Sequence, residues 1–241
     1  MNVAGILAKS RKRLDDETGA SSDRLWKSEE IIDDYANEVI RRLCRICRGL
    51  IVDSSTALDP NKVPMCQLTL SANIKGVTSP YVWKYDISPY ILEIERVKLA
   101  SQNDKLPKST SPEMDMAQLG WENADPAGPL AWLNDTDTDK IAFWPPPATA
   151  TTAALKVWRL PLSELAISDL VAVPEIPLRF HDDIVPGILQ MAFEKNDEET
   201  FRPGLAQKYE AKFLARAEFI KQELINQVVT VTTNSTRKAF R

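Results

Sequence analysis

Two neighbouring stretches of regularly spaced apolar residues, at 183–197 and 203–226, constrain the fold of this chain more than any other feature. Their apolar residues recur at spacings of three and four, which places them on one face of an α-helix. The first stretch carries Ile184, Val185, Ile188, Leu189, Ala192 and Phe193, and the second carries Leu205, Tyr209, Phe213, Ala217, Ile220 and Leu224. A polar run separates them, and Pro203 suits the first turn of the second helix. We therefore expect a helical hairpin that packs on further elements.

A third helix is predicted over residues 29–50. Ser28 is a suitable N-cap, and acidic residues follow it in the first turns, where they favour the helix dipole. Four arginines occupy the later turns: Arg41, Arg42, Arg45 and Arg48. Because no aromatic residue is interleaved for base stacking, we interpret them as a solvated helix face rather than a nucleic-acid site.

Residues 63–160 have the character of β-strands. Alternating or β-rich runs occur at 65–70, 81–87, 91–99, 140–144 and 155–160. The last two flank Pro145-Pro146-Pro147 and are interpreted as a hairpin with a stiffened loop. Between them and the earlier strands, residues 101–130 are polar and proline-rich, so we expect an excursion ordered by a neighbouring protein. Trp121 and Trp132 are the predicted tail or neighbour contacts in this region.

The predicted fold class is α+β. One domain, 28–226, combines a helical bundle, made of the first helix and the C-terminal hairpin, with a small antiparallel sheet. An extended N-terminal arm, 1–27, and a C-terminal tail, 227–241, flank this domain. Such arms are typical of a chain that becomes fully ordered inside an assembly.

Composition narrows the class of function. The formal net charge of −4 argues against a general nucleic-acid binder. No apolar run approaches the roughly 20 residues of a membrane span, and the basic residues near the N-terminus follow the apolar ones, the reverse of a secretory signal. Three cysteines form no disulfide framework. These patterns predict a soluble intracellular protein without a membrane partner.

Few residues offer a chemical centre. Cys44 and Cys47 have the spacing of a redox or zinc half-site, and Cys66 and His181 would complete a zinc site. The pair lies at the wrong end of its helix for a reactive thiol, and no second closely spaced pair accompanies it. The run from Asp135 to Asp139 resembles the start of a calcium loop, but Lys140 follows where glycine is needed. We predict no catalytic residues, metal or cofactor; the alternative is a Cys-x-x-Cys redox or zinc-binding enzyme.

Four segments together resemble the head-to-tail adaptor, or connector, proteins of tailed bacteriophages. The segments are Leu25–Glu38 (LWKSEEIIDDYANE), Tyr85–Ile94 (YDISPYILEI), Gly128–Trp132 with Ile141–Pro147 (GPLAW and IAFWPPP), and Ile176–Val185 (IPLRFHDDIV) with the helical pair after it. Their order and spacing over residues 25–226 carry the resemblance. The polar stretch at 101–127 and the basic arm are departures from the family pattern.

The resemblance implies a non-enzymatic virion protein of the neck, made in the cytoplasm of the bacterial host. Such proteins form a homo-oligomeric ring, commonly of twelve copies, that binds the portal protein, carries a tail or nozzle protein, and extends the channel through which DNA passes. Another virion ring protein of the same fold, such as a tail-completion protein, is an alternative.

The C-terminal tail is the predicted portal-binding segment. Its β-branched residues suit pairing with an exposed sheet edge, and its basic residues suit an acidic surface. The residues concerned are Val228, Val229, Thr230, Val231, Thr232, Thr233, Arg237, Lys238 and Arg241. The acidic net charge suits a channel that lets DNA slide without specific binding.

Overall fold

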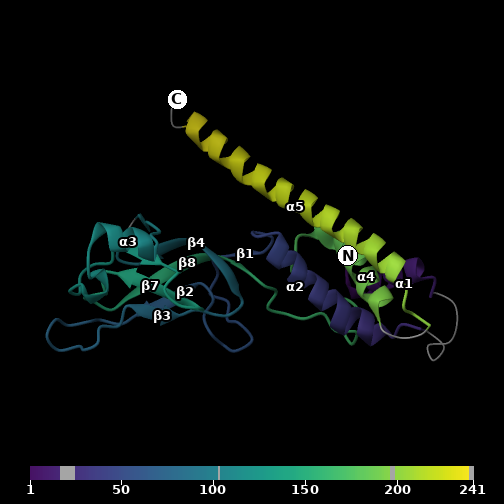
Figure 1. The fold of residues 1–241 in the computed structure, drawn as a ribbon, viewed down its shortest axis with the longest axis horizontal. Helices are drawn as coiled ribbons and strands as arrows, with labels where there is room; N and C mark the ends of the chain where they lie inside the picture. Colours follow the sequence, from purple (N-terminus) through teal and green to yellow (C-terminus); the bar gives the residue numbers. More distant parts are fainter. Residues whose placement is uncertain (17–24, 103, 196–198, 239–241) are drawn as a thin grey trace. The chain divides into compact units, whose positions relative to one another are not determined.

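The computed structural model describes residues 1–16, 25–102, 104–195 and 199–238, with side chains placed up to Gln227 (Figure 1). The chain divides into two compact units. The helical unit joins Met1–Ile51 to Leu160–Arg241, and the β unit is Val52–Arg159. The α+β class is therefore confirmed, although the expected single domain, 28–226, is divided between these units.

Helix α4 (Val185–Glu194) is the centre of the helical unit. Within the described chain it contacts α1 (Val3–Leu14), the π-helix η2 (Glu30–Ala36), the 3-10 helix η4 (Leu178–Ile184) and α5 (Pro203–Lys238). Eight of its ten residues are buried, so it is enclosed rather than amphipathic. Gly187 permits α4 to approach Val39 of helix α2 (Asn37–Ile46) closely, because a Cβ at position 187 would lie 2.6 Å from Cγ1 of Val39.

The N-terminal residues form helix α1 in place of the mobile arm expected over 1–27. The side chain of Asn2 caps the helix by accepting a hydrogen bond from the Gly5 backbone N–H at 3.0 Å. Buried Arg11 donates to the Asp16 carboxylate at 2.8 Å and to Ser28 Oγ at 2.8 Å. This arginine therefore ties α1 to the segment that precedes η2. Residues 17–24 lie outside the described chain.

The predicted helix 29–50 corresponds to two consecutive elements. The π-helix η2 passes directly into α2 (Asn37–Ile46), and Cys47 ends the helix. The buried side chains include Ile31, Ile32, Val39, Ile40 and Leu43.

Helix α5 is longer than predicted. Its 36 residues correspond to a length of about 54 Å. Ala206, Phe213, Ala217 and Ile220 are its buried side chains among the residues up to 227, and they pack toward α4, η4 and α2. The sequence predicts that this helix ends at 226, yet the backbone is helical to Lys238. Residues 227–238 contain no glycine or proline, and a β-branched residue costs a helix at most about 0.7 kcal/mol relative to alanine.

The β unit contains a five-stranded antiparallel sheet within its described residues. The order is β1 (Val52–Asp53), β8 (Thr151–Arg159), β4 (Ile91–Leu99) and β5 (Lys105–Leu106), and β2 (Gln67–Leu70) also pairs with β8. The two long strands, β4 and β8, pair along most of their length, with register shifts near Glu93 and Arg96. Alternate residues of β2 and of the second half of β4 are buried, as their sequence pattern predicts.

A second sheet, of three strands, completes the described part of the β unit. It pairs β3 (Lys84–Asp86) with β7 (Lys140–Trp144), and β7 with β6 (Ala131–Leu133). The predicted hairpin between β7 and β8 is wrong, because these strands belong to different sheets. Instead the chain leaves β7, crosses Pro145-Pro146-Pro147 and enters the five-stranded sheet (Figure 1).

Candidate interaction surfaces

The proline-rich stretch 101–130 is folded into the β unit. It forms β5, helix α3 (Ser111–Ala117) and a 3-10 turn at Trp121–Asn123. The capping box of α3 joins Thr110 and Glu113, and Glu113 Oε2 accepts from the Thr110 backbone N–H at 2.9 Å. Local hydrogen bonds of this kind stabilise the described part of this stretch within the chain itself.

Trp121 and Trp132, the two predicted neighbour contacts, are both buried in the β unit, with 3% and 1% of their surfaces exposed. Trp121 packs edge-on against Trp83, with ring centroids 5.4 Å apart, and its Nε1 donates to Asp115 at 2.8 Å. The ring of Trp132 lies under the Lys108 ammonium, 5.4 Å from the nitrogen. Residues of the same chain thus cover the surfaces through which these rings were expected to meet a neighbour.

The exposed apolar residues of the same region were missed. Met116 and Leu119 are 83% and 97% exposed, one near the end of α3 and the other just after it. No periodic pattern distinguishes them from Met114 in the sequence, because α3 is too short to show a stripe. Together with Leu130, which is 59% exposed, they are the large apolar side chains at the surface among the described residues of this stretch.

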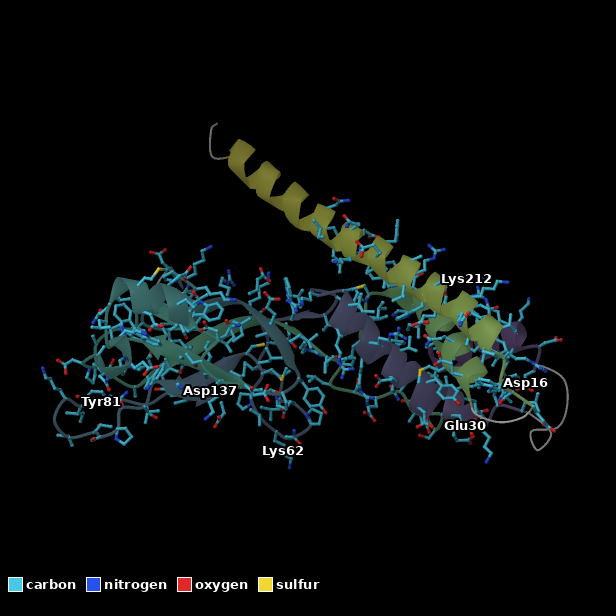
Figure 2. The ribbon with its side chains drawn as sticks, in the orientation of Figure 1. Asp16, Glu30, Lys62, Tyr81, Asp137 and Lys212 are labelled. Atoms are coloured by element: carbon cyan, nitrogen blue, oxygen red, sulfur yellow. The ribbon has the colours of Figure 1, made fainter. Side chains whose placement is uncertain are left out.

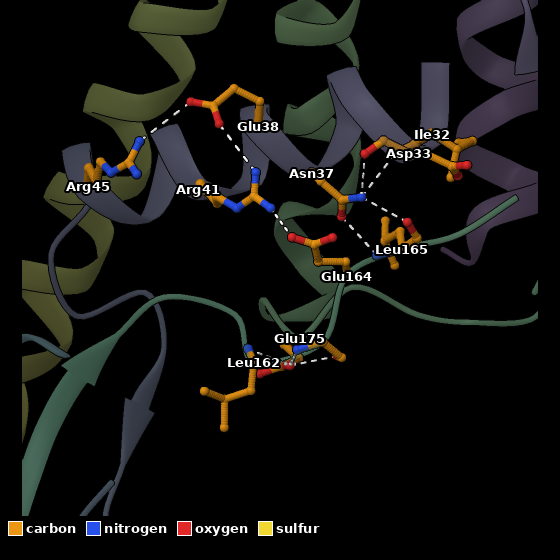
Figure 3. A network of polar contacts seen from close by, with 11 residues as sticks. Ile32, Asp33, Asn37, Glu38, Arg41, Arg45, Leu162, Glu164, Leu165 and Glu175 are labelled. Atoms are coloured by element: carbon orange, nitrogen blue, oxygen red, sulfur yellow. Dashed lines mark hydrogen bonds and ion pairs between the residues drawn. The ribbon is translucent and has the colours of Figure 1, made fainter. Parts of the chain in front are cut away.

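The arginines of α2 are engaged within the helical unit, in agreement with the interpretation as a helix face. Arg41 pairs with Glu38 and with Glu164, and Arg45 also reaches Glu38 (Figure 3). Arg42 donates to Gln190 Oε1 at 2.8 Å, and its guanidinium lies 5.1 Å from the centroid of the Phe213 ring. Their charges are therefore partly compensated inside the chain.

The connector between the β unit and η4 is held by side chains of η2 and α2. Asn37 exchanges two hydrogen bonds with the backbone of Leu165, and Asp33 Oδ1 accepts from the Ile167 backbone N–H at 2.7 Å (Figure 3). Further along, Glu175 accepts from the backbone N–H groups of Leu162 and Ser163. This segment, expected only to be a proline-punctuated link, is part of the helical framework.

The cysteines do not form a reactive centre. Burial raises the pKa of the Cys47 thiol to about 11 and that of Cys66 to about 11. Both thiols therefore stay protonated near neutral pH, whereas redox and zinc chemistry require the thiolate. Cys47 Sγ donates to the Ala217 carbonyl at 3.1 Å, and Cys44 is buried on the same helix. Among the described residues, no group of three or more His, Cys, Asp or Glu side chains is placed to hold a metal ion.

The other chemical candidates also have structural partners. His181 is buried, and its Nε2 lies 2.8 Å from the Ile176 carbonyl oxygen, while its Nδ1 contacts Met1. In the run from Asp135 to Asp139, the carboxylate of Asp135 accepts a hydrogen bond from the Ser111 backbone N–H at 2.7 Å. A hydrogen bond from Lys84 lowers the pKa of Asp137. These groups tie segments of the chain together.

The predicted portal-binding residues 228–233, with Arg237 and Lys238, lie on the final turns of α5. Arg241 lies outside the described residues. Ile220 is the last fully buried side chain among the residues of α5 up to 227, and Glu223 still pairs with Arg179 of η4 at 3.1 Å. From Glu223 to Lys238 the helical backbone spans about 22 Å. The β-strand expected at 228–233 is helical here. The backbone thus places these residues along one end of a single helix.

Comparison with models of protein families shows which family the chain belongs to. The model of the family described as SU10 adaptor protein matches residues 1–237. The chain belongs to this family. Comparison with curated protein sequences finds no match.

The SU10 adaptors are phage head-to-tail adaptors, so the resemblance identified from the sequence is confirmed. The match covers α1 and nearly all of α5, and both are therefore parts of the adaptor rather than additions to it. Membership implies a structural, non-enzymatic role that connects components of the phage head and tail. No helix within the described part of the adaptor is long and apolar enough to cross a membrane.

Proposed function

We propose that this adaptor forms a ring beneath the portal of the filled head, with twelve copies around the channel. The ring joins the head to a tail or nozzle protein and lengthens the path along which DNA leaves. The observation that carries the proposal is the family match over residues 1–237, which includes both units. The adaptor is thus made in the host cytoplasm and ends in the neck of the virion.

The end of α5 is the proposed portal contact. Residues 228–238 continue a helix that passes the last fully buried side chain of its described part. A rigid stem of this kind delivers Val228–Thr233, Arg237 and Lys238 to a partner at a fixed distance from the helical unit, and Arg241 follows them in sequence. Pairing as a β-strand would require these turns to unwind, so we propose that the segment binds as a helix in a groove.

We expect the channel of the proposed ring not to hold DNA tightly. The net charge of −4 disfavours general phosphate binding. The three arginines of α2, Arg41, Arg42 and Arg45, also have acidic or amide partners in the helical unit, which lowers the positive charge they present. DNA is therefore expected to slide past the ring without specific contacts.

Mixing the adaptor with its portal and counting subunits by electron microscopy tests the ring. We expect a twelve-fold ring on the portal for the full chain. Deleting residues 228–241 is expected to abolish binding, whereas deleting only 239–241 retains most of it. Failure of the full chain to bind the portal would overturn the proposal. Binding to tail components alone would instead support a tail-completion protein.

A further inference from the structure

Helix α5 carries an outward face that has basic and apolar side chains and no acidic ones at its centre. Leu205, Lys208, Lys212, Ala215 and Phe219 share this face, because they recur at spacings of three, four and seven. All five are exposed, and 58% of Phe219 is accessible. The ammonium of Lys212 rests over the Tyr209 ring at 4.9 Å, and no ion pair within the described chain engages Lys208. This face has no partner among the described helices.

The opposite side of the helical unit is acidic. Exposed Glu29, Asp33 and Asp34 lie at the start of η2, beside Glu30. Burial, followed by the charges of Glu30 and Asp34, raises the pKa of Tyr35, which shows that these carboxylates act on one small region.

The two faces cannot meet within one chain. Helix α4 lies between them, because it contacts both η2 and α5. Figure 2 shows Lys212 on the outer side of α5 and Glu30 on the far side of the helical unit. Two different, complementary surfaces on opposite sides of one subunit are what a head-to-tail contact between copies requires.

We propose that the basic face of α5 in one copy docks on the acidic start of η2 in the next copy. The inference rests on the proposed ring, for which it names the contact between subunits. Leu205 and Phe219 supply apolar area, while the charges set the register and exclude other pairings. Exposed ion pairs contribute little and are screened by salt, so the contact is weak and salt-dependent on its own.

A cysteine pair tests the contact directly. In the full-length variant Asp34→Cys/Lys212→Cys, the new thiols lie on opposite sides of one chain, so a disulfide between them forms only between copies. Oxidation at low salt, with and without the portal, is expected to give a ladder of trimers and larger species. The single variants are expected to stop at dimers. The absence of a ladder in both conditions would overturn the inference, even if the unmodified chain forms a ring on its portal.

Charge reversal provides the second measurement. The variant Lys208→Glu/Lys212→Glu, tested in the ring assay without the introduced cysteines, is expected to reduce ring formation at least tenfold. Adding Glu29→Lys/Asp34→Lys to this variant is expected to restore ring formation. The matched control is Lys98→Glu/Lys105→Glu, which makes the same change of charge at exposed sites of the β unit. Equal losses in the control and the test variant would contradict the proposal. If the unmodified chain forms no ring on the portal, the proposed function fails, and the disulfide ladder still decides the contact.

Discussion

Asn37 and Leu165 exchange two hydrogen bonds although 128 residues separate them. The Asn37 amide donates from Nδ2 to the Leu165 carbonyl at 2.8 Å, and its Oδ1 accepts from the Leu165 N–H at 2.8 Å (Figure 3). One side chain thus satisfies both backbone groups of a buried residue in the connector. The same Nδ2 also donates to the Asp33 carbonyl at 2.8 Å, which anchors the connector to the junction of η2 and α2.

Replacing this side chain is expected to weaken the helical unit. Asn37→Ala leaves the N–H and C=O of buried Leu165 without their partner, and we expect the free energy of unfolding to fall by about 2–4 kcal/mol. Urea unfolding followed by circular dichroism at the helical wavelength measures the loss. Glu38→Ala is the control, because Glu38 makes only partly exposed ion pairs and should cost less than about 1 kcal/mol. Equal losses would refute the special role of Asn37.

Two glycines with opposite surroundings give a matched pair of substitutions. A Cβ at Gly187 would lie 2.6 Å from Val39 Cγ1 and 3.1 Å from Phe213 Cδ2, whereas nothing lies within 4 Å of one at Gly204. We expect Gly187→Ala to destabilise the helical unit by about 1–3 kcal/mol through overpacking. Gly204→Ala, in the first turn of α5, should instead raise stability by up to about 1 kcal/mol. Thermal unfolding measures both effects. Melting temperatures that shift in the same direction in the two variants would show that α4 has room for a Cβ at position 187.

The β unit is expected to lose stability in acid through Asp53. Burial alone would raise the pKa of Asp53, but hydrogen bonds from Ser55 and Arg159 outweigh it and lower the pKa. The unfolded chain therefore takes up the proton first. The stabilisation is present above the ordinary aspartate pKa of about 3.9 and disappears as the pH falls through the lower folded pKa.

Tryptophan fluorescence measures this pH dependence, because five of the six tryptophans lie between Val52 and Arg159. Urea unfolding between pH 7 and pH 3 should show a smaller loss in Asp53→Asn than in the unmodified chain. The variant should also be less stable at pH 7, since the Arg159 guanidinium, 2.7 Å from the carboxylate, loses its charged partner. An unchanged pH profile would argue against the assigned pKa direction.

The thiols are expected to react slowly. At pH 8 an ordinary cysteine is partly ionised, whereas Cys47 and Cys66 have pKa values raised to about 11. We expect alkylation of these residues by iodoacetamide to be on the order of a hundredfold slower in the folded protein than in urea. Peptide mass spectrometry identifies each modified site. Rapid alkylation of Cys47 in the folded chain would revive the redox alternative.

Local patterns predicted the regular elements well. Strands β4 and β7 begin and end where the alternation in the sequence begins and ends, and the apolar spacing located α4 and α5. The π-helix within the predicted first helix could not be anticipated, because its apolar residues also fit an α-helical stripe. The extension of α5 was missed because β-branched residues favour strands only when a partner strand is present.

Long-range contacts account for the remaining differences. Helix α1 was interpreted as part of an arm because polar residues, Ser10 and Arg11, occupy buried positions on it. The partners that stabilise the buried arginine, Asp16, Trp26 and Ser28, follow later in the sequence. Of the two partners of β7, β3 could not be predicted from the neighbouring sequence, since it lies more than fifty residues earlier than β7. The predicted surface contacts, Trp121 and Trp132, were chosen because they are large and aromatic. Whether such a side chain is exposed depends on which residues the fold packs against it.

The pairing of β1 with β8 has a consequence for synthesis. Val52 pairs with Trp158, so the first and last strands of the β unit lie side by side. A ribosome releases all of Val52–Arg159 before it makes α4, the helix on which the rest of the helical unit packs. The β unit can therefore close first, while α1, η2 and α2 wait for their partner. Nascent adaptor chains should accordingly expose an apolar helical segment until α4, Val185–Glu194, has been translated.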